Sequence, residues 1–263
     1  MNIIVCIKPA PDPKRWDNIQ LHPVTKALQR EGIPSVLGPL DKRAIEEGIC
    51  LKEVQGGKVA VVSMAPPSAK DNLVEALAMG ADEAYLLSDR VFAGSDTWST
   101  ARVLSRGIKK LGDFDLIICG SYSLDGSTGQ VGAQLAEFLG IPNVGQVVAV
   151  ESFADGVFRT KSMMESGFRV LETPLPALFT VSRDINTPRF TSLMGVIEAE
   201  GKPLNTWVAS DLGVLPEEVG FKGSYTQTGD IFLPAMKRKT EMLSGDPEEV
   251  VKEIIHKIRL ALG

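Results

Sequence analysis

Short apolar runs alternate with stretches of helical periodicity over the first part of the chain. Runs that indicate buried strands lie at residues 2–7, 58–64, 83–88 and 115–120. Between these runs apolar residues recur at helical spacing, for example over residues 98–111. Alternating strands and helices are typical of a parallel sheet with crossover helices. The sequence therefore predicts an α/β fold with a mostly parallel, Rossmann-like sheet.

The pattern changes after residue 145. Three segments alternate apolar and polar residues around the pairs Asp155-Gly156 and Ser166-Gly167, which indicates antiparallel strands joined by turns. Residues 177–182 then predict one more core strand. We therefore expect the sheet to carry an antiparallel extension, and we place the whole α/β domain at residues 1–185.

Periodicity weakens beyond Pro188, where glycine and proline interrupt a long stretch. Irregular loops of this length are uncommon inside a compact domain, so the stretch is expected to form an arm that lies on another surface. Asp246-Pro247 is a strong helix start, and an apolar stripe follows it. Residues 186–263 are thus expected to hold an extended arm and a C-terminal helix. The stripe suits packing on a partner subunit as well as packing on its own domain.

Composition narrows the class of protein. The 263 residues are 44% hydrophobic and 23% charged, as in ordinary globular domains. The net charge of -5 argues against a nucleic-acid partner, because binding to phosphate backbones needs clustered Lys and Arg. No apolar run reaches the roughly 18 to 20 residues of a membrane span, and the first residues do not form a signal peptide, so we expect a cytoplasmic protein.

The few cysteines and histidines indicate no disulfide framework, metal site or catalytic centre. Cys6, Cys50 and Cys119 are odd in number, widely spaced and set among apolar residues, which indicates neither a disulfide framework nor a zinc site. The histidines are His22, in a polar loop, and His256, in a predicted surface helix. We expect both to be non-catalytic, and we nominate no catalytic side chain and no metal ligand.

Two polar loops combine glycine, hydroxyls and a predicted helix start. Residues 121–132 bring backbone N–H groups to a helix expected to begin at Thr128, and residues 94–100 do the same at Asp96. Such helix starts follow strand ends, where ligands bind in open parallel sheets, and they favour anions. Plain helix capping is the alternative interpretation of each loop when that loop is considered alone.

Two further positions belong to the same expected edge of the sheet. Met64 ends the second predicted strand and would form a slot beside a planar group, although methionine often only fills space. Asp41 is expected to be the N-cap of the helix that follows Gly38-Pro39-Leu40. None of these loops is a Walker motif or a GxGxxG fingerprint. Because they converge at one sheet edge, they predict a nucleotide-like ligand.

Several segments together resemble the beta subunits of electron transfer flavoproteins. The resemblance is carried by IVCIKPAPD (4–12), GPLDKRAIEEGICLKE (38–53), ALAMGADEAYLLSD (76–89), DGSTGQVGAQLAEFLG (125–140) and LPALFTVSRDINTPRFTSLMGVIEA (175–199). It implies a heterodimer with an alpha subunit that carries FAD. It also implies an adenine nucleotide in the beta subunit, which is AMP in simple carriers and a second FAD in members that bifurcate electrons from NADH.

Two segments are similar to the bifurcating branch, namely SDRVFAGSDTWSTA (88–101) and LHPVTKALQREGIPSVLGPLDKRAIEEG (21–48). The resemblance places the nucleotide on a set of residues from five segments of the chain: Cys6, Ala10, Gly38, Asp41, Met64, Gly94, Asp96, Thr97, Thr100, Asp125, Gly126, Ser127, Thr128, Gly129, Gln130 and Val131. Leu193 matches the leucine of the recognition loop, which docks a dehydrogenase, here expected to be of the acyl-CoA type.

The sequence thus favours an electron-transfer subunit that binds FAD and takes part in bifurcation from NADH. One alternative is a non-bifurcating carrier whose beta subunit holds structural AMP. Another, from a different class, is a nucleotide-binding regulatory module without redox chemistry. The choice between AMP and FAD depends mainly on residues 94–100, and in particular on whether Asp96 is a ligand residue or only a helix cap.

Overall fold

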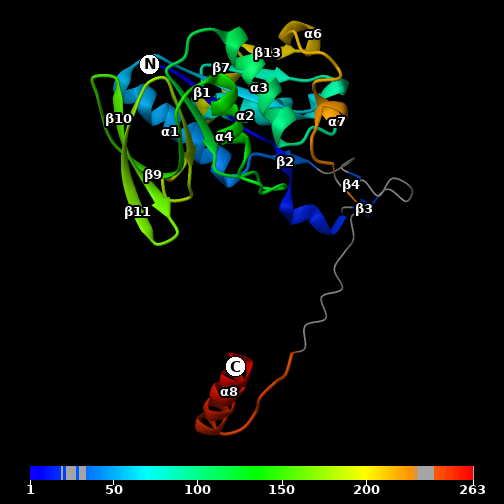
Figure 1. The fold of residues 1–263 in the computed structure, drawn as a ribbon, viewed down its shortest axis with the longest axis vertical. Coiled ribbons are helices and arrows are strands. Elements are labelled where there is room, and N and C mark those ends of the chain that lie inside the picture. Colours follow the sequence, from blue (N-terminus) through cyan, green and yellow to red (C-terminus); the bar gives the residue numbers. More distant parts are fainter. Residues whose placement is uncertain (19, 22–27, 30–33, 228, 230–239, 263) are drawn as a thin grey trace. The chain divides into compact units, whose positions relative to one another are not determined.

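The computed structural model describes residues 1–263 apart from 19, 22–27, 30–33, 228, 230–239 and 263 (Figure 1). The chain divides into two compact units, Met1–Gly229 and Asp230–Gly263. The second unit contains α8 (Pro247–Leu262), in which Asp246 Oδ1 accepts a hydrogen bond from the Glu248 N–H at 2.9 Å. The helix predicted after Asp246 is therefore confirmed. Across the described ranges, none of the helices has both the length and the hydropathy needed to cross a bilayer.

A nine-stranded sheet forms the centre of the first unit in the described part of the chain, with the strand order β11-β10-β9-β12-β8-β1-β6-β7-β13. The strands that run parallel to one another are β1 (Asn2–Cys6), β6 (Lys58–Met64), β7 (Glu83–Leu87), β8 (Leu116–Gly120), β9 (Asn143–Ala154), β12 (Ala177–Val181) and β13 (Leu204–Trp207). The predicted mostly parallel α/β fold is confirmed. Four of its strands lie within one residue of the predicted apolar runs.

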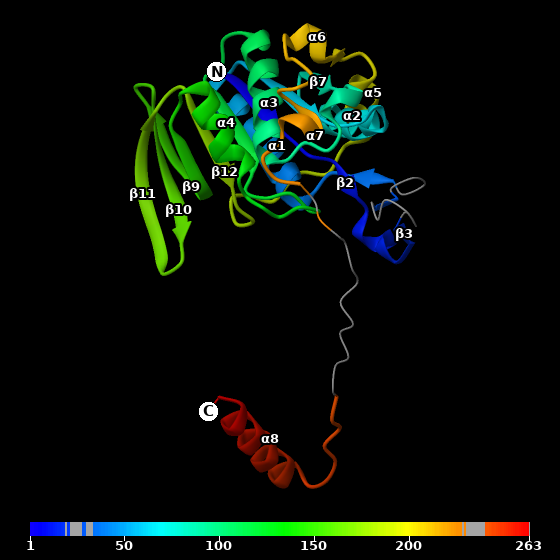
Figure 2. The same cartoon turned by 45° about the vertical axis from the view of Figure 1, so that its right-hand side comes forward.

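Helices cover both faces of this sheet (Figures 1 and 2). One face carries α1 (Pro39–Gln55), α2 (Lys70–Met79) and the short α5 (Leu193–Ala199), which packs beside α2. The other face carries α3 (Thr97–Leu111), α4 (Val131–Leu139) and α6 (Ala209–Leu212). The alternating side chains of each strand therefore enter two separate apolar cores. This is why the strands are apolar at nearly every position.

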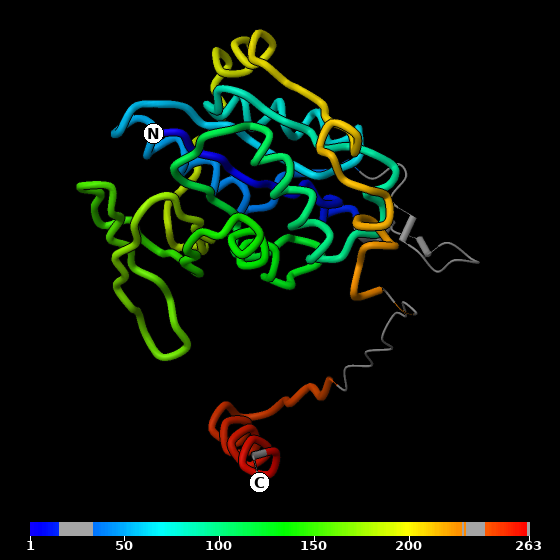
Figure 3. The backbone as a smooth tube through the Cα atoms, turned by 45° about the horizontal axis from the view of Figure 1, so that its top comes forward, coloured from blue at the N-terminus to red at the C-terminus, as the bar shows by residue number. Residues whose placement is uncertain are grey.

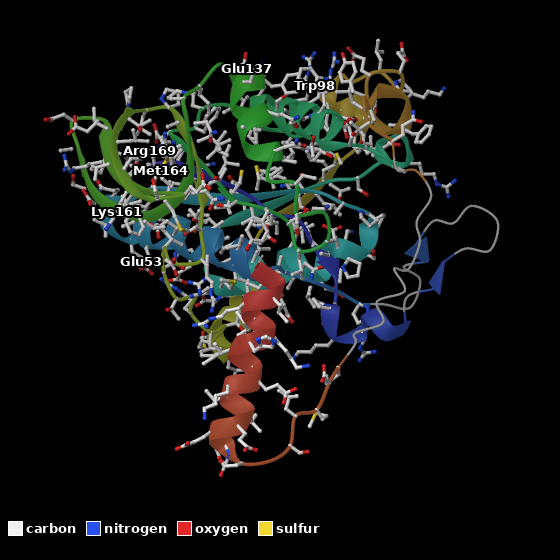
Figure 4. The ribbon with its side chains drawn as sticks, turned by 60° about the horizontal axis from the view of Figure 1, so that its bottom comes forward. Glu53, Trp98, Glu137, Lys161, Met164 and Arg169 are labelled. Atoms are coloured by element: carbon white, nitrogen blue, oxygen red, sulfur yellow. The ribbon has the colours of Figure 1, made fainter. Side chains whose placement is uncertain are left out.

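The predicted antiparallel extension is also present. Strand β10 (Val157–Met164) pairs antiparallel with β9 after a turn at Asp155-Gly156, and β11 (Gly167–Pro174) pairs antiparallel with β10. The hairpin that they form is plainly visible in Figure 2, and Lys161, Met164 and Arg169 lie on it in Figure 4. Phe158 of β10 contacts Phe179 of β12, so the extension continues the same core.

Small elements complete the first unit. They are β2 (Ala10–Pro11) paired with β5 (Ser35–Val36), β3 (Gln20–Leu21) paired with β4 (Leu28–Gln29), the 3-10 turns η1 (Pro13–Asn18), η2 (Pro67–Ala69) and η3 (Arg90–Phe92), and α7 (Gly220–Gly223). Part of the segment 21–48 that resembles the bifurcating branch lies outside the described residues, at 22–27 and 30–33, and so does His22.

The expectation of an irregular arm from Pro188 is wrong for residues 193–223. This stretch forms α5, β13, α6 and α7, and β13 adds an edge strand beside β7. Each element has only four to seven residues. Elements this short show no clear periodicity, and Gly213 and Gly220 end or begin them with positive φ angles of 61° and 62°. What the sequence indicated as an arm is a folded part of the first unit.

Candidate functional site

The candidate site lies where the chain order of the parallel strands reverses. From β1 the chain crosses to β6 and β7 on one side, and then returns to β8 on the other side of β1. In open α/β sheets, the crevice outside the carboxyl ends of such neighbouring strands is the usual ligand site. The loops after β1 and β8 therefore define the crevice, and both contain residues that the sequence singled out.

A lysine joins these two loops. Lys8 Nζ, after β1, lies 2.7 Å from Asp125 Oδ1, after β8. Burial on its own would raise the pKa of the Asp125 carboxyl, but the hydrogen bond and charge of Lys8 hold it below its usual range. The ammonium is half exposed. It therefore places a positive charge at the mouth of the crevice, beside the loop that leads to α4.

Asp41 lies beneath this pair, in the first turn of α1. It is not the N-cap, as expected from the sequence, because Pro39 occupies the first helical position and Gly38 is the cap. The carboxyl accepts the Lys8 N–H at 3.1 Å and a second backbone N–H from Gly38. Burial dominates these bonds and raises the pKa of Asp41 to about 7. A Cβ on Gly38 would lie 2.7 Å from Asp41 Oδ2, so any other residue there would displace the Asp41 carboxyl.

The loop before α4 forms a cradle of backbone N–H groups. Ser127 and Gly129 have positive φ angles of 51° and 66°, and α4 begins at Val131 with Gln130 as its cap. The prediction that the helix begins at Thr128 is therefore wrong, because left-handed residues cannot continue a right-handed helix. Gly129 in the left-handed region and Gln130 in the right-handed region form the backbone geometry of an anion-binding nest.

The amides of this cradle are free to bind. Among the described residues, no acceptor takes a hydrogen bond from the N–H groups of residues 128–133, and the first helical acceptor bond is that of Gln134 to Gln130. Residues 126–130 are exposed. Several donors that converge on open space at a helix N-terminus suit a phosphate group. The structure thus brings together the whole predicted segment from Asp125 to Val131.

The loop before α3 lies beside the cradle. Asp96 is the N-cap of α3, and its Oδ1 accepts the Ser99 N–H at 2.9 Å, while Thr100 N–H bonds the Asp96 carbonyl oxygen. Thr97 Oγ1 donates to Gln130 Oε1 at 3.2 Å, which ties this loop to the cradle. Gly94 has a φ of 78°. Residues 94–100 and 125–131, which are separate in sequence, therefore form one continuous polar edge.

The other predicted residues form the floor of the crevice. Cys6 pairs in register with Cys119 at the ends of β1 and β8, and both thiols are buried and free. Met64 ends β6 and is half-buried, and Ala10 is fully buried in β2. In the described ranges no cluster of His, Cys, Asp or Glu is arranged to hold a metal.

Leu193 belongs to a different surface. It begins α5, on the sheet face opposite α4, and its side chain is 78% exposed. The chain before it is held to α1 by Arg189, which bonds Glu46 and Glu53 at 2.9 Å and 2.7 Å. The structure therefore separates the predicted docking residue from the predicted nucleotide residues.

Comparison with known proteins decides the family. The model of the electron transfer flavoprotein domain matches residues 25–212. The electron transfer flavoprotein subunit beta of Thermoanaerobacterium thermosaccharolyticum is 43% identical over 259 residues, which are 98% of each chain. The chain belongs to the electron transfer flavoprotein beta-subunit family.

Two other relatives of this beta subunit carry more specific names. The caffeyl-CoA reductase–Etf complex subunit CarD of Acetobacterium woodii is 40% identical over 261 residues, covering 98% of both chains. The acryloyl-CoA reductase electron transfer subunit gamma of Anaerotignum propionicum is 36% identical over 268 residues, also covering 98% of both. Membership implies flavin-related electron transfer and an alpha-subunit partner.

The sequence pattern missed two parts of this beta-subunit site. Lys8 lies within a segment that carried the resemblance, and its position directly after a buried strand was the signal that could have marked it. The Asp96 N–H donates to Ser224 Oγ and the Thr226 N–H donates to Asp96 Oδ2, and these bonds span about 130 positions in sequence. No local pattern indicates them.

Proposed function

We propose that the chain is the beta subunit of a heterodimeric flavoprotein that binds FAD in the crevice and passes electrons from NADH by flavin-based bifurcation. The observation that carries the proposal is the cradle of unpaired N–H groups at residues 128–133, which follows directly on the Asp125 that Lys8 bonds. Donors and positive charge of this kind fit the phosphates of an adenine nucleotide. When it is bound there, the flavin supplies the redox chemistry.

The choice of FAD over AMP is supported by the second loop. Thr97 bonds Gln130 in the cradle, so residues 94–100 extend the polar edge beyond what a single phosphate needs. A dinucleotide has a second phosphate and a further ring to place along that edge. The residues expected to line it are Gly94, Thr97 and Thr100, and Met64 lies at the end of β6 nearby in the strand order.

The side chains of the crevice would bind and orient, and none needs to act as a general base. Lys8 would neutralise phosphate charge, and the amides of residues 128–133 would donate to phosphate oxygens. Asp41 would hold the loop after β1 in place through the Lys8 N–H. Cys6 would present a small apolar surface at the floor.

Two further surfaces fit the partners of a beta subunit. Leu193, Met194 and Ile197 expose apolar side chains on α5 and would dock a dehydrogenase. The names of two relatives refer to caffeyl-CoA reductase and acryloyl-CoA reductase, which supports an acyl-CoA class of partner. On α8, Val251, Ile254, Ile255 and Ile258 expose an apolar stripe that would pack on the alpha subunit.

The proposal is tested with the complex of the chain and its alpha subunit. NADH should reduce the complex, and reduction should be accompanied by transfer to a low-potential acceptor only when a high-potential acceptor is also present. A complex that NADH does not reduce, and that contains AMP, would instead be the simple carrier. Leu193→Ala should slow electron exchange with the dehydrogenase without changing nucleotide content, whereas the equally apolar surface variant Leu215→Ala should change neither.

A further inference from the structure

Two adjacent residues at the start of α3 form hydrogen bonds with two different parts of the chain. Thr97 bonds Gln130 of the cradle at 3.2 Å. The residue before it, Asp96, bonds the chain segment that ends the first unit, through Ser224 and Thr226. Two adjacent residues therefore connect the candidate phosphate cradle to the segment from which the C-terminal residues continue.

Asp96 is occupied by this second connection. Its Oδ2 accepts from the Thr226 N–H at 2.9 Å and from Thr226 Oγ1 at 3.0 Å, and its own N–H donates to Ser224 Oγ at 2.8 Å. The Tyr225 N–H adds a further bond. Together with the cap bond from Ser99, these donors surround the carboxylate with groups of the chain itself.

Neighbouring contacts hold the same segment, residues 218–226, along α3. The Phe221 N–H bonds the Ala93 carbonyl at 3.0 Å, and the Gly220 N–H bonds Ser95 Oγ at 3.1 Å. Tyr225 packs edge-on against Trp98, with ring centroids 5.6 Å apart. In Figure 3 this orange segment runs beside the loop that leads into α3, and Figure 4 labels Trp98. The segment is thus bonded along the whole of that loop.

We propose that Asp96 is a positioning residue that couples nucleotide binding in the cradle to the anchoring of residues 218–226. The proposal rests on the proposed function, because it takes the cradle to be the nucleotide site. A nucleotide that orders residues 94–100 would strengthen the bonds of Asp96 to Thr226. Anchoring of Thr226 would in turn hold Thr97 and Gln130 in place for the nucleotide. Such coupling is reciprocal by thermodynamic necessity.

Asp96 and Asp89 are both helix caps, so the same substitution at each gives a test variant and a matched control. Asp96→Asn keeps an oxygen for the cap, since Asn caps helices as well as Asp does. It replaces the second oxygen with an amide that cannot accept from Thr226. Asp89 is a similar cap whose Oδ2 accepts the Ala209 N–H at 3.0 Å, so Asp89→Asn makes the same change toward α6 instead of residues 224–226. Thr226→Val removes one donor and leaves Asp96 unaltered.

The experiment measures chymotryptic cleavage after Tyr225, which is 81% exposed. The full-length chain in complex with its alpha subunit is compared with and without FAD, and separately with AMP, and nucleotide affinity is measured by titration. Local cleavage follows the opening of the segment. In the wild type, nucleotide should slow cleavage several-fold. Asp96→Asn should raise cleavage about tenfold and abolish most of the protection that nucleotide gives the wild type.

Thr226→Val should show the same two effects at smaller size, and Asp89→Asn should leave both quantities at wild-type values. The coupling is overturned if the nucleotide binds but leaves cleavage unchanged, or if nucleotide protects Asp96→Asn as fully as it protects the wild type. A wild-type complex that binds no nucleotide in the titration would overturn the proposed function as well. The titration of the wild type therefore separates failure of the site from failure of the coupling alone.

Discussion

Lys8 Nζ and Asp125 Oδ1 lie 2.7 Å apart and join the loop after β1 to the loop after β8. These strands are neighbours at the point where the chain order reverses. The pair therefore closes one side of the crevice and leaves a half-exposed ammonium beside the cradle. Its position suggests that its main contribution is to a bound phosphate and not to folding.

Replacement of Lys8 should affect nucleotide affinity much more than the free energy of unfolding. Lys8→Gln should weaken nucleotide binding about tenfold, because one charge-assisted phosphate contact is lost. It should change the free energy of unfolding by only about 1 kcal/mol, since the lysine side of the ion pair is half exposed. Lys58→Gln is the control, because Lys58 makes a similar 2.8 Å pair with Glu83 at the opposite end of the strands. Equal loss of affinity in both variants would contradict the site.

A glycine pair tests the cradle. Gly129 and Gly140 have φ angles of 66° and 71° at the two ends of α4. Alanine at either position should cost about 1 kcal/mol of stability, because L residues resist the left-handed region. Only Gly129→Ala should lower nucleotide affinity, since Gly140 ends the helix at the far side, where an added Cβ would meet no atom within 4 Å. Unfolding titrations and nucleotide binding are compared, and identical affinities would argue against the cradle.

The sheet was predictable from sequence for a physical reason. Strand β8 is buried along both faces and therefore reads as an unbroken apolar run. Strand β13 was missed because Leu204–Trp207 is a four-residue edge strand with two exposed polar residues in the middle. Nothing local distinguishes such a strand from a loop, and only its pairing with β7 makes it one.

Because burial raises the pKa of Asp41, its carboxyl should make the fold less stable as the pH rises. Burial raises its pKa from 3.8 to about 7 in the folded chain. Between these values the folded state keeps a proton that the unfolded state has lost, so stability should fall as pH rises from about 4 to about 7. Asp41→Asn should remove this contribution and gain a few kcal/mol, on the order of 1.4 per pKa unit, relative to wild type at pH 8. Urea titrations across this pH range provide the measurement.

Asp125→Asn should change the stability at pH 7 in the direction opposite to Asp41→Asn. Lys8 lowers the pKa of Asp125, so its charged form stabilises the fold at neutral pH and this stability is lost as pH falls below its usual value of 3.8. The variant should therefore be less stable than wild type at pH 7. If the two variants shift stability in the same direction at pH 7, the electrostatic assignment of the crevice is wrong.

Arg189 should control the order of the segment before α5. Its guanidinium bonds Glu46, whose side chain is only 7% exposed, and also Glu53. Arg189→Gln should cost about 2 kcal/mol, because a buried carboxylate loses its partner. It should also speed amide hydrogen exchange over residues 190–199. Arg159→Gln, which loses two exposed partners on the β9–β11 meander, should leave that exchange unchanged. Equal exchange in both variants would contradict this role.

In the candidate site too, some features could be predicted from neighbouring residues, and others depend on residues far away in the sequence. The N-cap role of Asp96 was predictable, because a cap depends on the next three residues. Its bond to Thr226 joins residues 130 positions apart. Similarly, hydroxyls and glycines marked residues 121–132, but only the left-handed angles at Ser127 and Gly129 show where α4 begins and which amides stay free.

The central claim is that the crevice holds FAD. The most direct test is to purify the chain with its alpha subunit, denature the complex, and quantify the released nucleotides against the protein concentration. If the crevice holds FAD, the complex should release two FAD molecules per heterodimer and no AMP, and Gly129→Ala should lose one of them. One FAD together with one AMP per heterodimer would show that the crevice holds AMP instead.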